Sequence, residues 1–360
     1  MVEQRSWGRR HAVLTGLGAV AGVSACSSGG TASGGEGVPT AVDLPASSPR
    51  AGGSPKVREA VARLVPDRGR YFGISTLRTP WSPEETDRVA QRAGVRPNLL
   101  EYFVKWNEDY RPDGVAACYR QGAVPLLTWE PWASLSKGTE QPEYRLARIA
   151  GGAHDAYVRR FARAVAQHGR PLILRFAHEM NGTWFSWAEG RNGNGPGEYV
   201  EAWRHVRRLF DEAGAGNVVW QWSPNILRTI EETRLEPLYP GDEYVDLVGL
   251  SGYRKYEGRA AEVFEPALGE MRAFTRLPLL ISETGARPGE KKAAWTRDLF
   301  PWMEGREDVI GFVWFERGTQ TGGMRDWRFA ETAESLRAFQ EGIAGFELCN
   351  VPGGEPLTGD

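Results

Sequence analysis

Between residues 71 and 315, short apolar runs alternate with segments of helical periodicity, and this alternation is the strongest constraint on the fold. Each run is too short for a helix and suits a buried strand of a parallel sheet. Strands that alternate with helices are typical of βαβ units. The predicted strands are 71–75, 98–103, 124–128, 172–174, 217–222, 244–250, 279–282 and 309–315.

The helices between these strands show start and stop signals. Ser82-Pro83-Glu84-Glu85 predicts a capping box with proline in the first turn, and Gly169 and Gly214 are predicted to follow helix ends. The predicted helices are 83–94, 115–121, 154–168, 198–213, 261–275, 289–304 and 331–342. Eight strands with intervening helices predict one (β/α)8 TIM barrel. A doubly wound sheet is the rival fold, but no glycine-rich phosphate loop follows the first strand.

Composition describes an ordinary soluble protein. The 44 basic and 46 acidic residues give a formal net charge of −2, so neither nucleic acid nor another polyanion is indicated as a partner. The 14 tryptophans are the unusual feature. Tryptophan suits flat, half-hydrated surfaces such as the faces of sugar rings.

The N-terminal segment is predicted to be an export signal. Arg9-Arg10 precede an apolar run over 12–23 that is too short to span a bilayer and resembles a twin-arginine signal. Val23-Ser24-Ala25-Cys26 resembles a bacterial lipobox, which predicts lipidation of Cys26. An ordinary cleaved signal with an unrelated cysteine is the alternative. Both interpretations predict export, and the lipobox interpretation adds membrane contact through the lipid anchor only.

The remaining boundaries follow from composition. We expect a signal peptide at 1–26, a flexible Ser/Gly/Pro-rich linker at 27–58, the barrel at 59–348 and a tail at 349–360. The spacing of Cys118 and Cys349 does not decide whether they form a disulfide. We expect a monomer.

Two predicted strands end at a glutamate. The run at 172–174 leads to Glu179, and the run at 279–282 leads to Glu283. In a barrel the carboxyl ends of all strands meet on one face, so these carboxylates are expected to lie close together. Paired carboxylates are what glycoside hydrolysis requires. Either glutamate alone could instead cap a helix or pair with an arginine.

Aromatic and polar residues accompany the two glutamates and predict a cleft lined with tryptophan that stacks on sugar rings. His178-Glu179 is not part of an HExxH motif, so we predict neither a metal nor another cofactor. The absence of a GxSxG motif disfavours an α/β-hydrolase. The predicted residues at the strand ends are Trp106, Trp129, Glu130, Trp132, Arg175, His178, Glu179, Trp184, Trp222, Asn225, Tyr253, Glu283 and Trp314.

The stretch 175–187, RFAHEMNGTWFSW, resembles the acid/base signature of glycoside hydrolase family 26. The match extends to 282–285 (SETG), Tyr253 and Trp314, and the resemblance covers roughly residues 70 to 345. That family is the β-mannanase family, which also contains mixed-linkage β-glucanases and β-1,3-xylanases.

The resemblance implies a retaining double displacement with Glu179 as acid/base and Glu283 as nucleophile. Tyr253 and Arg175 would keep Glu283 ionised. A neighbouring Glu283 carboxylate should raise the pKa of Glu179. His178 would contact the −1 sugar near its 2-hydroxyl.

The family pattern also assigns aromatic residues to subsites. Trp314 would form the floor of the −1 subsite and Trp184 would line the acceptor side, while Trp132 and Trp222 are further candidates for substrate binding. Tyr253 and Trp314 could instead be ordinary core residues.

One residue departs from the mannanase pattern. Ser251 lies where an aspartate that contacts the sugar is expected, which weakens the preference for mannose. We expect endo-hydrolysis of β-1,4-mannan, with mixed-linkage β-glucan or β-1,3-xylan as alternatives. A catalytically inactive glycan-binding protein is the alternative from another functional class.

Overall fold

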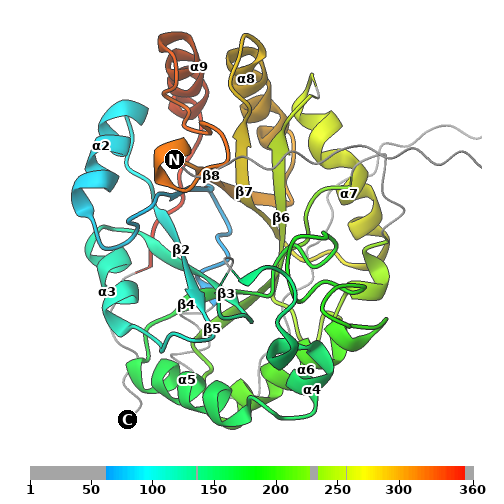
Figure 1. Ribbon diagram of the computed structural model, residues 1–360. Helices are drawn as coiled ribbons and strands as arrows, with labels where there is room; N and C mark the ends of the chain where they lie inside the picture. Colours follow the sequence, from blue (N-terminus) through cyan, green and yellow to red (C-terminus); the bar gives the residue numbers. More distant parts are fainter. Residues whose placement is uncertain (1–61, 135–136, 228–233, 257, 353–360) are drawn as a thin grey trace, which may run out of the picture. The chain divides into compact units, whose positions relative to one another are not determined.

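The computed structural model describes residues 62–134, 137–227, 234–256 and 258–352. In these residues, eight parallel strands form a closed barrel in sequence order, with β8 paired to β1. Figure 1 views the barrel along its axis, with the helices arranged around it. The strands are β1 Tyr71–Ser75, β2 Leu99–Lys105, β3 Val124–Glu130, β4 Leu172–Phe176, β5 Val218–Trp222, β6 Leu247–Arg254, β7 Leu279–Ala286 and β8 Val309–Phe315.

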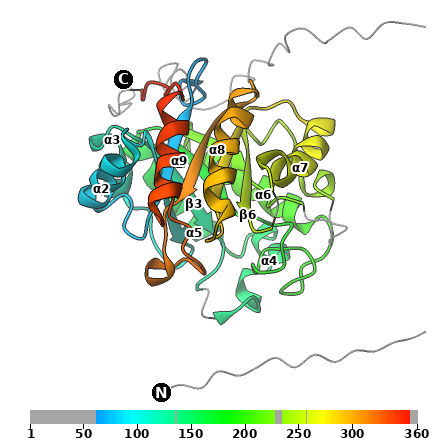
Figure 2. The same cartoon turned by 90° about the horizontal axis from the view of Figure 1, so that it is seen from above.

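The helices confirm the predicted alternation. The α-helices are α2 Pro83–Ala93, α3 Pro112–Arg120, α4 Leu146–Ala150, α5 Asp155–His168, α6 Glu198–Glu212, α7 Ala260–Phe274, α8 Lys291–Glu304 and α9 Ala333–Ala344. The sequence did not predict helix α4. It also did not predict three short 3-10 helices, which are η2 Pro142–Tyr144, η3 Glu236–Leu238 and η4 Thr319–Thr321. Figure 2 shows the barrel from the side, with long loops following the strands at one end.

Several strands continue beyond the apolar runs that predicted them. β6 ends at Arg254 rather than Leu250, and β7 ends at Ala286 rather than Ser282. These extensions hydrogen-bond to each other, with Ser251 opposite Glu283 and Tyr253 opposite Gly285. The apolar pattern stops early because the interior of the barrel is polar at this end.

The predicted helix ends are partly confirmed. Gly169 ends α5 in the left-handed conformation that glycine favours. The capping box at α2 was wrong, because the Ser82 side chain caps no backbone N–H of that helix. The Glu85 carboxylate instead accepts hydrogen bonds from the Thr76 hydroxyl and the Arg78 amide, and so fixes the loop after β1.

Two apolar clusters hold the barrel together. The larger cluster lies between strands and helices and includes Cys118. The smaller cluster contains side chains from the first halves of the strands, such as Leu99, Ile173 and Leu280, together with Cys349. Both cysteines are buried and free, so no disulfide joins them.

The other expectations about the chain's organisation fall largely outside the described residues. Cys26, the predicted signal at 1–26 and the linker at 27–58 lie there, as does most of the predicted tail. All eight strands lie within the predicted barrel domain, 59–348. None of the described helices is both long and apolar enough to cross a bilayer.

Candidate active site

A strained turn brings Glu179 to the end of the barrel. Directly after β4, Ala177 and Glu179 adopt φ angles of 45° and 53°, which non-glycine residues rarely adopt. The Glu179 amide donates to the Ser223 carbonyl at 2.7 Å and holds the turn against the end of β5. Such strain is typically found at functional sites, where the surrounding structure enforces it.

Asn181 fixes the same turn to the neighbouring loop. Its side chain donates to the Asn225 carbonyl at 2.8 Å and accepts from the Asn225 amide at 2.7 Å. The Asn225 side chain in turn acts on the Glu179 carboxyl and lowers its pKa, against the larger effect of burial. Asn181 and Asn225 therefore position Glu179.

Arg175 lies fully buried at the centre of the barrel. One guanidinium nitrogen, Nη1, donates to Glu101 Oε1 at 3.0 Å and also to Glu283 Oε1. The remaining nitrogens donate to the hydroxyls of Ser223 and Ser251. A buried guanidinium is tolerated only when its donors are satisfied in this way.

Glu283 and Tyr253 come from the paired ends of β7 and β6. The Tyr253 hydroxyl donates to Glu283 Oε2 at 2.5 Å, so the predicted hydrogen bond is present. Burial, and then the charge of Glu283, hold the pKa of Tyr253 well above its usual range. Tyr253 therefore remains a donor, and each oxygen of Glu283 accepts a hydrogen bond, one from Arg175 and one from Tyr253.

Glu179 lies beside Glu283 in a different electrostatic environment. Burial, and then the Glu283 charge, raise the pKa of Glu179. Ligand-type atoms of His178, Glu179 and Glu283 all lie within 4.8 Å of one another. This separation fits the roughly 5–5.5 Å of retaining glycosidases and not the roughly 6.5–9.5 Å of inverting enzymes.

The same three side chains are the kind that could hold a cation. The Arg175 guanidinium, however, already places a positive charge against Glu283. The absence of a metal therefore remains our prediction.

His178 is enclosed by aromatic rings. Its imidazole lies 4.7 Å from the Phe185 ring and 6.1 Å from the Phe103 ring, measured between centroids. Burial, and then the nearby Arg175 charge, hold the pKa of His178 well below its usual value, so the ring is neutral. Its Nδ1 has no hydrogen-bond partner among the described residues.

Trp184 is the predicted tryptophan that does lie at an open surface. It is 41% exposed, and its Nε1 donates to Glu179 Oε2 at 2.7 Å. An exposed indole in contact with the candidate acid fits the acceptor side of a cleft.

The predictions for Trp314 and Trp222 were wrong. Both are fully buried and point outward to the helices. Trp314 packs against Phe339 of α9, and Trp222 packs against Phe274 of α7. Side chains alternate between the two faces of a strand, and both tryptophans occupy outward positions.

Other predicted tryptophans build the walls behind the site. Trp129 and Trp106 are buried and pack against one another in a tilted arrangement, with 5.0 Å between ring centroids. Trp132 is also buried; its Nε1 donates to Glu130 Oε2 at 3.0 Å, and its ring packs edge-on against Trp187. None of the three has a free face for a sugar ring.

Two aromatic residues that the sequence did not suggest lie next to Tyr253. The ring centroid of Trp327 is 4.8 Å from that of Tyr253, and the centroid of Phe315 is 5.8 Å from it. Phe315 follows Trp314 directly and therefore points to the opposite face of β8. The alternation along β8 was the signal that could have identified Phe315.

Glu101 is a further buried acid that the sequence analysis missed. It lies in a strand that reads as apolar, Leu99–Lys105. Burial, and then the Glu283 charge, raise its pKa to about 8. Because Leu99 belongs to the inner apolar cluster, the period of two places Glu101 inside the barrel as well.

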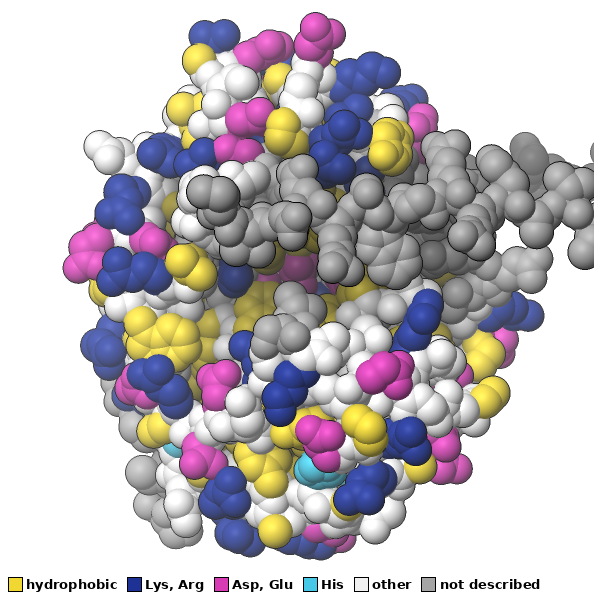
Figure 3. Space-filling model, in the orientation of Figure 1, with side chains coloured by type: hydrophobic (Ala, Val, Ile, Leu, Met, Phe, Trp, Pro, Cys, Tyr) yellow, Lys and Arg dark blue, Asp and Glu magenta, His cyan; other side chains and the backbone are white. Residues whose placement is uncertain are grey.

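Figure 3 shows the end of the barrel at which the strands terminate, with acidic and hydrophobic side chains visible near its centre.

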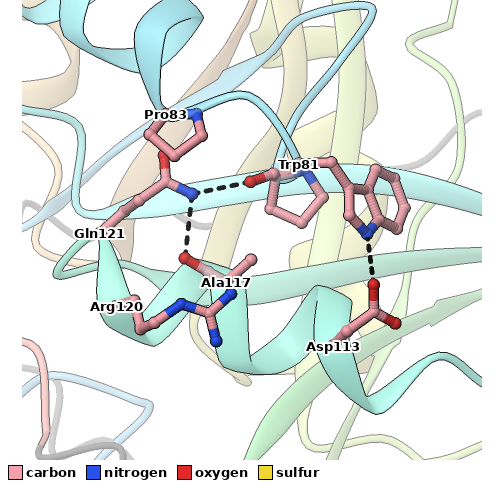
Figure 4. Close-up of a pocket in the computed structure, with 7 residues that line it drawn as sticks. Trp81, Pro83, Asp113, Ala117, Arg120 and Gln121 are labelled. Atoms are coloured by element: carbon pink, nitrogen blue, oxygen red, sulfur yellow. Dashed lines mark hydrogen bonds between the residues drawn. The ribbon is translucent and has the colours of Figure 1, made fainter.

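A separate pocket of about 210 Å³ lies on the outside, between α2 and α3 (Figure 4). There the Trp81 Nε1 donates to Asp113 Oδ2, and the Arg111 guanidinium lies 4.6 Å from the centroid of the indole ring. This pocket contains neither candidate glutamate.

Comparisons with known proteins agree with this arrangement. The model of glycosyl hydrolase family 26 matches residues 147–282, which include Arg175, His178 and Glu179. This part of the chain is therefore similar to glycosyl hydrolase family 26. Endoglucanase H of Acetivibrio thermocellus is 31% identical over 265 residues, covering 69% of this chain and 28% of that protein. A mannan endo-1,4-beta-mannosidase of Bacillus subtilis is 30% identical over 214 residues, 51% of this chain and 58% of that protein.

Solved structures of family 26 proteins share the fold. A Cellulomonas fimi endo-beta-1,4-mannanase double mutant superposes with a TM-score of 0.64 at 20% identity, covering 84% of this chain and 76% of that one. A Bacteroides ovatus beta-mannanase of the family gives 0.61 at 18% identity, covering 83% and 96%. The chain spans 28%, 60% and 17% of the lengths of three curated relatives that it matches.

Proposed function

We propose that this chain is a family 26 retaining endo-β-glycanase that hydrolyses β-1,4-mannan. The observation that carries the proposal is the pair Glu179 and Glu283, whose carboxylate oxygens lie within 4.8 Å. Their environments differ as double displacement requires. The Glu179 carboxyl has a raised pKa, and the Glu283 carboxylate is hydrogen-bonded to Arg175 and Tyr253.

In the first step, the Glu283 carboxylate attacks the anomeric carbon while the bond to the leaving oxygen breaks. The Glu179 proton moves to that oxygen. In the second step, ionised Glu179 takes a proton from water, the water oxygen attacks the anomeric carbon, and the ester bond to Glu283 breaks. Each residue thus returns to its starting state.

The neighbouring side chains have defined parts in these steps. Tyr253 and Arg175 donate to the two oxygens of Glu283 and orient it for attack. Trp184 contacts Glu179 on the acceptor side, and neutral His178 is available to hydrogen-bond with the 2-hydroxyl of the −1 sugar.

The substrate depends on a few contacts around the −1 sugar. Ser251 is fully buried and its hydroxyl accepts a hydrogen bond from Arg175, so it positions Arg175 and offers no direct sugar contact. Recognition of the axial 2-hydroxyl of mannose must then come from His178 or from the aromatic residues around Tyr253.

A β-glucan is the second candidate substrate. Similarity to Endoglucanase H extends over 69% of the chain, more than to the Bacillus mannanase. A Vibrio beta-1,3-xylanase, 27% identical over 295 residues, makes xylan a third substrate to test.

Release of reducing sugar from galactomannan, glucomannan, barley β-glucan and β-1,3-xylan, assayed side by side, tests the proposal. We expect release from galactomannan and glucomannan, with a Glu283→Ala variant as the inactive control. Activity on barley glucan alone would replace mannan with β-glucan. Binding without release on all four polymers would favour the non-catalytic, glycan-binding alternative.

We also propose that the protein is exported and anchored through lipidated Cys26, so that a flexible linker lets the barrel reach polymer. The Arg9-Arg10 pair and the sequence before Cys26 support this. Cys26→Ala should release the protein from the membrane fraction of its host. Unchanged membrane fractionation of that variant would contradict the anchor.

A further inference from the structure

Glu101 shares a single guanidinium nitrogen with the candidate nucleophile. Nη1 of Arg175 donates to Glu101 Oε1 at 3.0 Å and to Glu283 Oε1. The Thr128 hydroxyl also donates to Glu101 Oε1, at 2.7 Å. Glu101 of β2 and Glu283 of β7 thus contact the same nitrogen of Arg175.

The two oxygens of Glu101 differ sharply. Oε1 accepts two hydrogen bonds, whereas Oε2 is buried and has no partner among the described residues. The side chain is fully inaccessible to solvent. An ionised oxygen without a donor in such a place is unfavourable, and a proton on Oε2 removes that charge.

Several charged groups act on Glu101 from the surrounding strands. Arg175 of β4 and Glu283 of β7 are the nearest, and Arg317 after β8 adds a second positive charge. The Arg317 guanidinium stacks on Phe315 and donates to the Ser75 hydroxyl. Tyr253 of β6 also experiences the charge of Glu101.

We propose that Glu101 is a positioning residue. It is a neutral carboxylic acid that accepts a hydrogen bond from Arg175, so the guanidinium charge is directed at Glu283 alone. The proposal deepens the proposed function and rests on it for its catalytic consequence. A neutral Glu101 would also retain Arg175 when Glu283 is esterified and no longer carries a charge. The raised pKa of Glu101, about 8, agrees with this protonation state.

Infrared spectroscopy tests the protonation state directly. At pH 6, the difference spectrum between wild type and Glu101→Gln should show the loss of one protonated-carboxyl band and of no carboxylate band. In the wild type that band should disappear as the pH rises through about 8. Loss of a carboxylate band at pH 6 would overturn the proposal.

Glu316→Gln is the matched control. Glu316 is a buried glutamate whose pKa is raised by burial to about 7, but it accepts from the Phe329 amide, away from Arg175. This variant should lose a protonated-carboxyl band and keep wild-type kcat/KM. If Glu101→Gln fails to fold, the band is sought in a variant whose other raised-pKa glutamates are replaced. Absence of the protonated-carboxyl band from that variant at pH 6 would overturn the proposal. That variant is Glu130→Gln/Glu179→Gln/Glu189→Gln/Glu316→Gln.

Kinetics tests the positioning role. Glutamine keeps a neutral acceptor for Arg175, so Glu101→Gln should retain kcat/KM within about threefold, with an unmoved acid limb of its pH profile. Glu101→Ala should lose about 100-fold, because Arg175 Nη1 and Thr128 lose their acceptor. Equal losses of kcat/KM in both variants, or a shifted acid limb of the Glu101→Gln pH profile, would contradict the positioning role. The infrared result does not depend on turnover, so it distinguishes failure of this proposal from failure of the proposed function.

Discussion

The two halves of the barrel interior are built from the same strands but from opposite chemistry. Leu99 and Glu101 lie two residues apart on one face of β2, as do Ile173 and Arg175 on β4, and Val219 and Gln221 on β5. The first residue of each pair belongs to the inner apolar cluster, and the second is buried and polar. On each of these strands, the apolar core residue and the polar residue of the site are therefore only two positions apart.

This difference shows where the molecule gains stability and where it loses some of it. Aliphatic side chains in the first half leave water at no electrostatic cost. In the second half, burial leaves polar atoms without partners among the described residues: Glu101 Oε2, His178 Nδ1 and both side-chain polar atoms of Gln221. Unsatisfied buried groups are rare in folded proteins, and their clustering beside two glutamates points to a functional site.

Removing the nucleophile should have the largest effect on activity. Glu283→Ala should lower kcat by about 10⁶-fold, as loss of a catalytic nucleophile does. Its thermal stability should fall, because the buried Arg175 guanidinium loses its charged partner. Turnover of an aryl oligosaccharide and a melting curve measure both. Retained turnover would exclude Glu283 as nucleophile.

Removing the acid/base should separate two classes of substrate. Glu179→Ala should reduce hydrolysis of polymer by about 10²- to 10⁴-fold, the usual contribution of a general acid. Dinitrophenyl glycosides, whose leaving group needs no proton, should still form the glycosyl-enzyme rapidly. Equal losses on both substrates would contradict the assignment of Glu179.

A substitution in the apolar half should have the converse effect. Ile173→Ala should reduce the free energy of unfolding by about 2–5 kcal/mol, because it opens a cavity at a fully buried site. Activity at a temperature where the variant is folded should be close to that of the wild type. Urea unfolding and kcat together test this, and a large loss of kcat without a loss of stability would break the division between the halves.

The free energy of unfolding should also depend on pH. Burial is the main cause that raises the folded-state pKa of Glu101 to about 8, and of Glu130 and Glu316 to about 7. The unfolded chain releases these protons near pH 4.3, at the ordinary pKa of glutamate. Between about pH 4.5 and 8 the folded state therefore binds more protons, and the free energy of unfolding should fall as the pH rises.

Urea unfolding at pH 5 and pH 8 measures this fall. Glu101→Gln should make it smaller, whereas Ile173→Ala should lower stability equally at both pH values. Stability of the wild type that is constant or rises across this window would contradict the protonated state of the buried glutamates.

The sequence predicted the barrel and brought Glu179 and Glu283 together, because apolar runs and strand ends follow simple local rules. It failed where the direction of a side chain mattered. Trp222 and Trp314 were assigned to the cleft from their position near a strand end, but they occupy outward positions. Charge on an apolar strand was also overlooked, since Glu101 interrupts a hydrophobic pattern at only one position.

The central claim is that Glu179 and Glu283 carry out double displacement, and proton NMR of the first sugar released tests it most directly. Two successive inversions at the anomeric carbon return the β configuration, so the initial reducing end from a β-linked oligosaccharide should be the β anomer. Slow conversion to the equilibrium mixture of anomers should follow. Initial appearance of the α anomer would show a single inversion and would contradict the account.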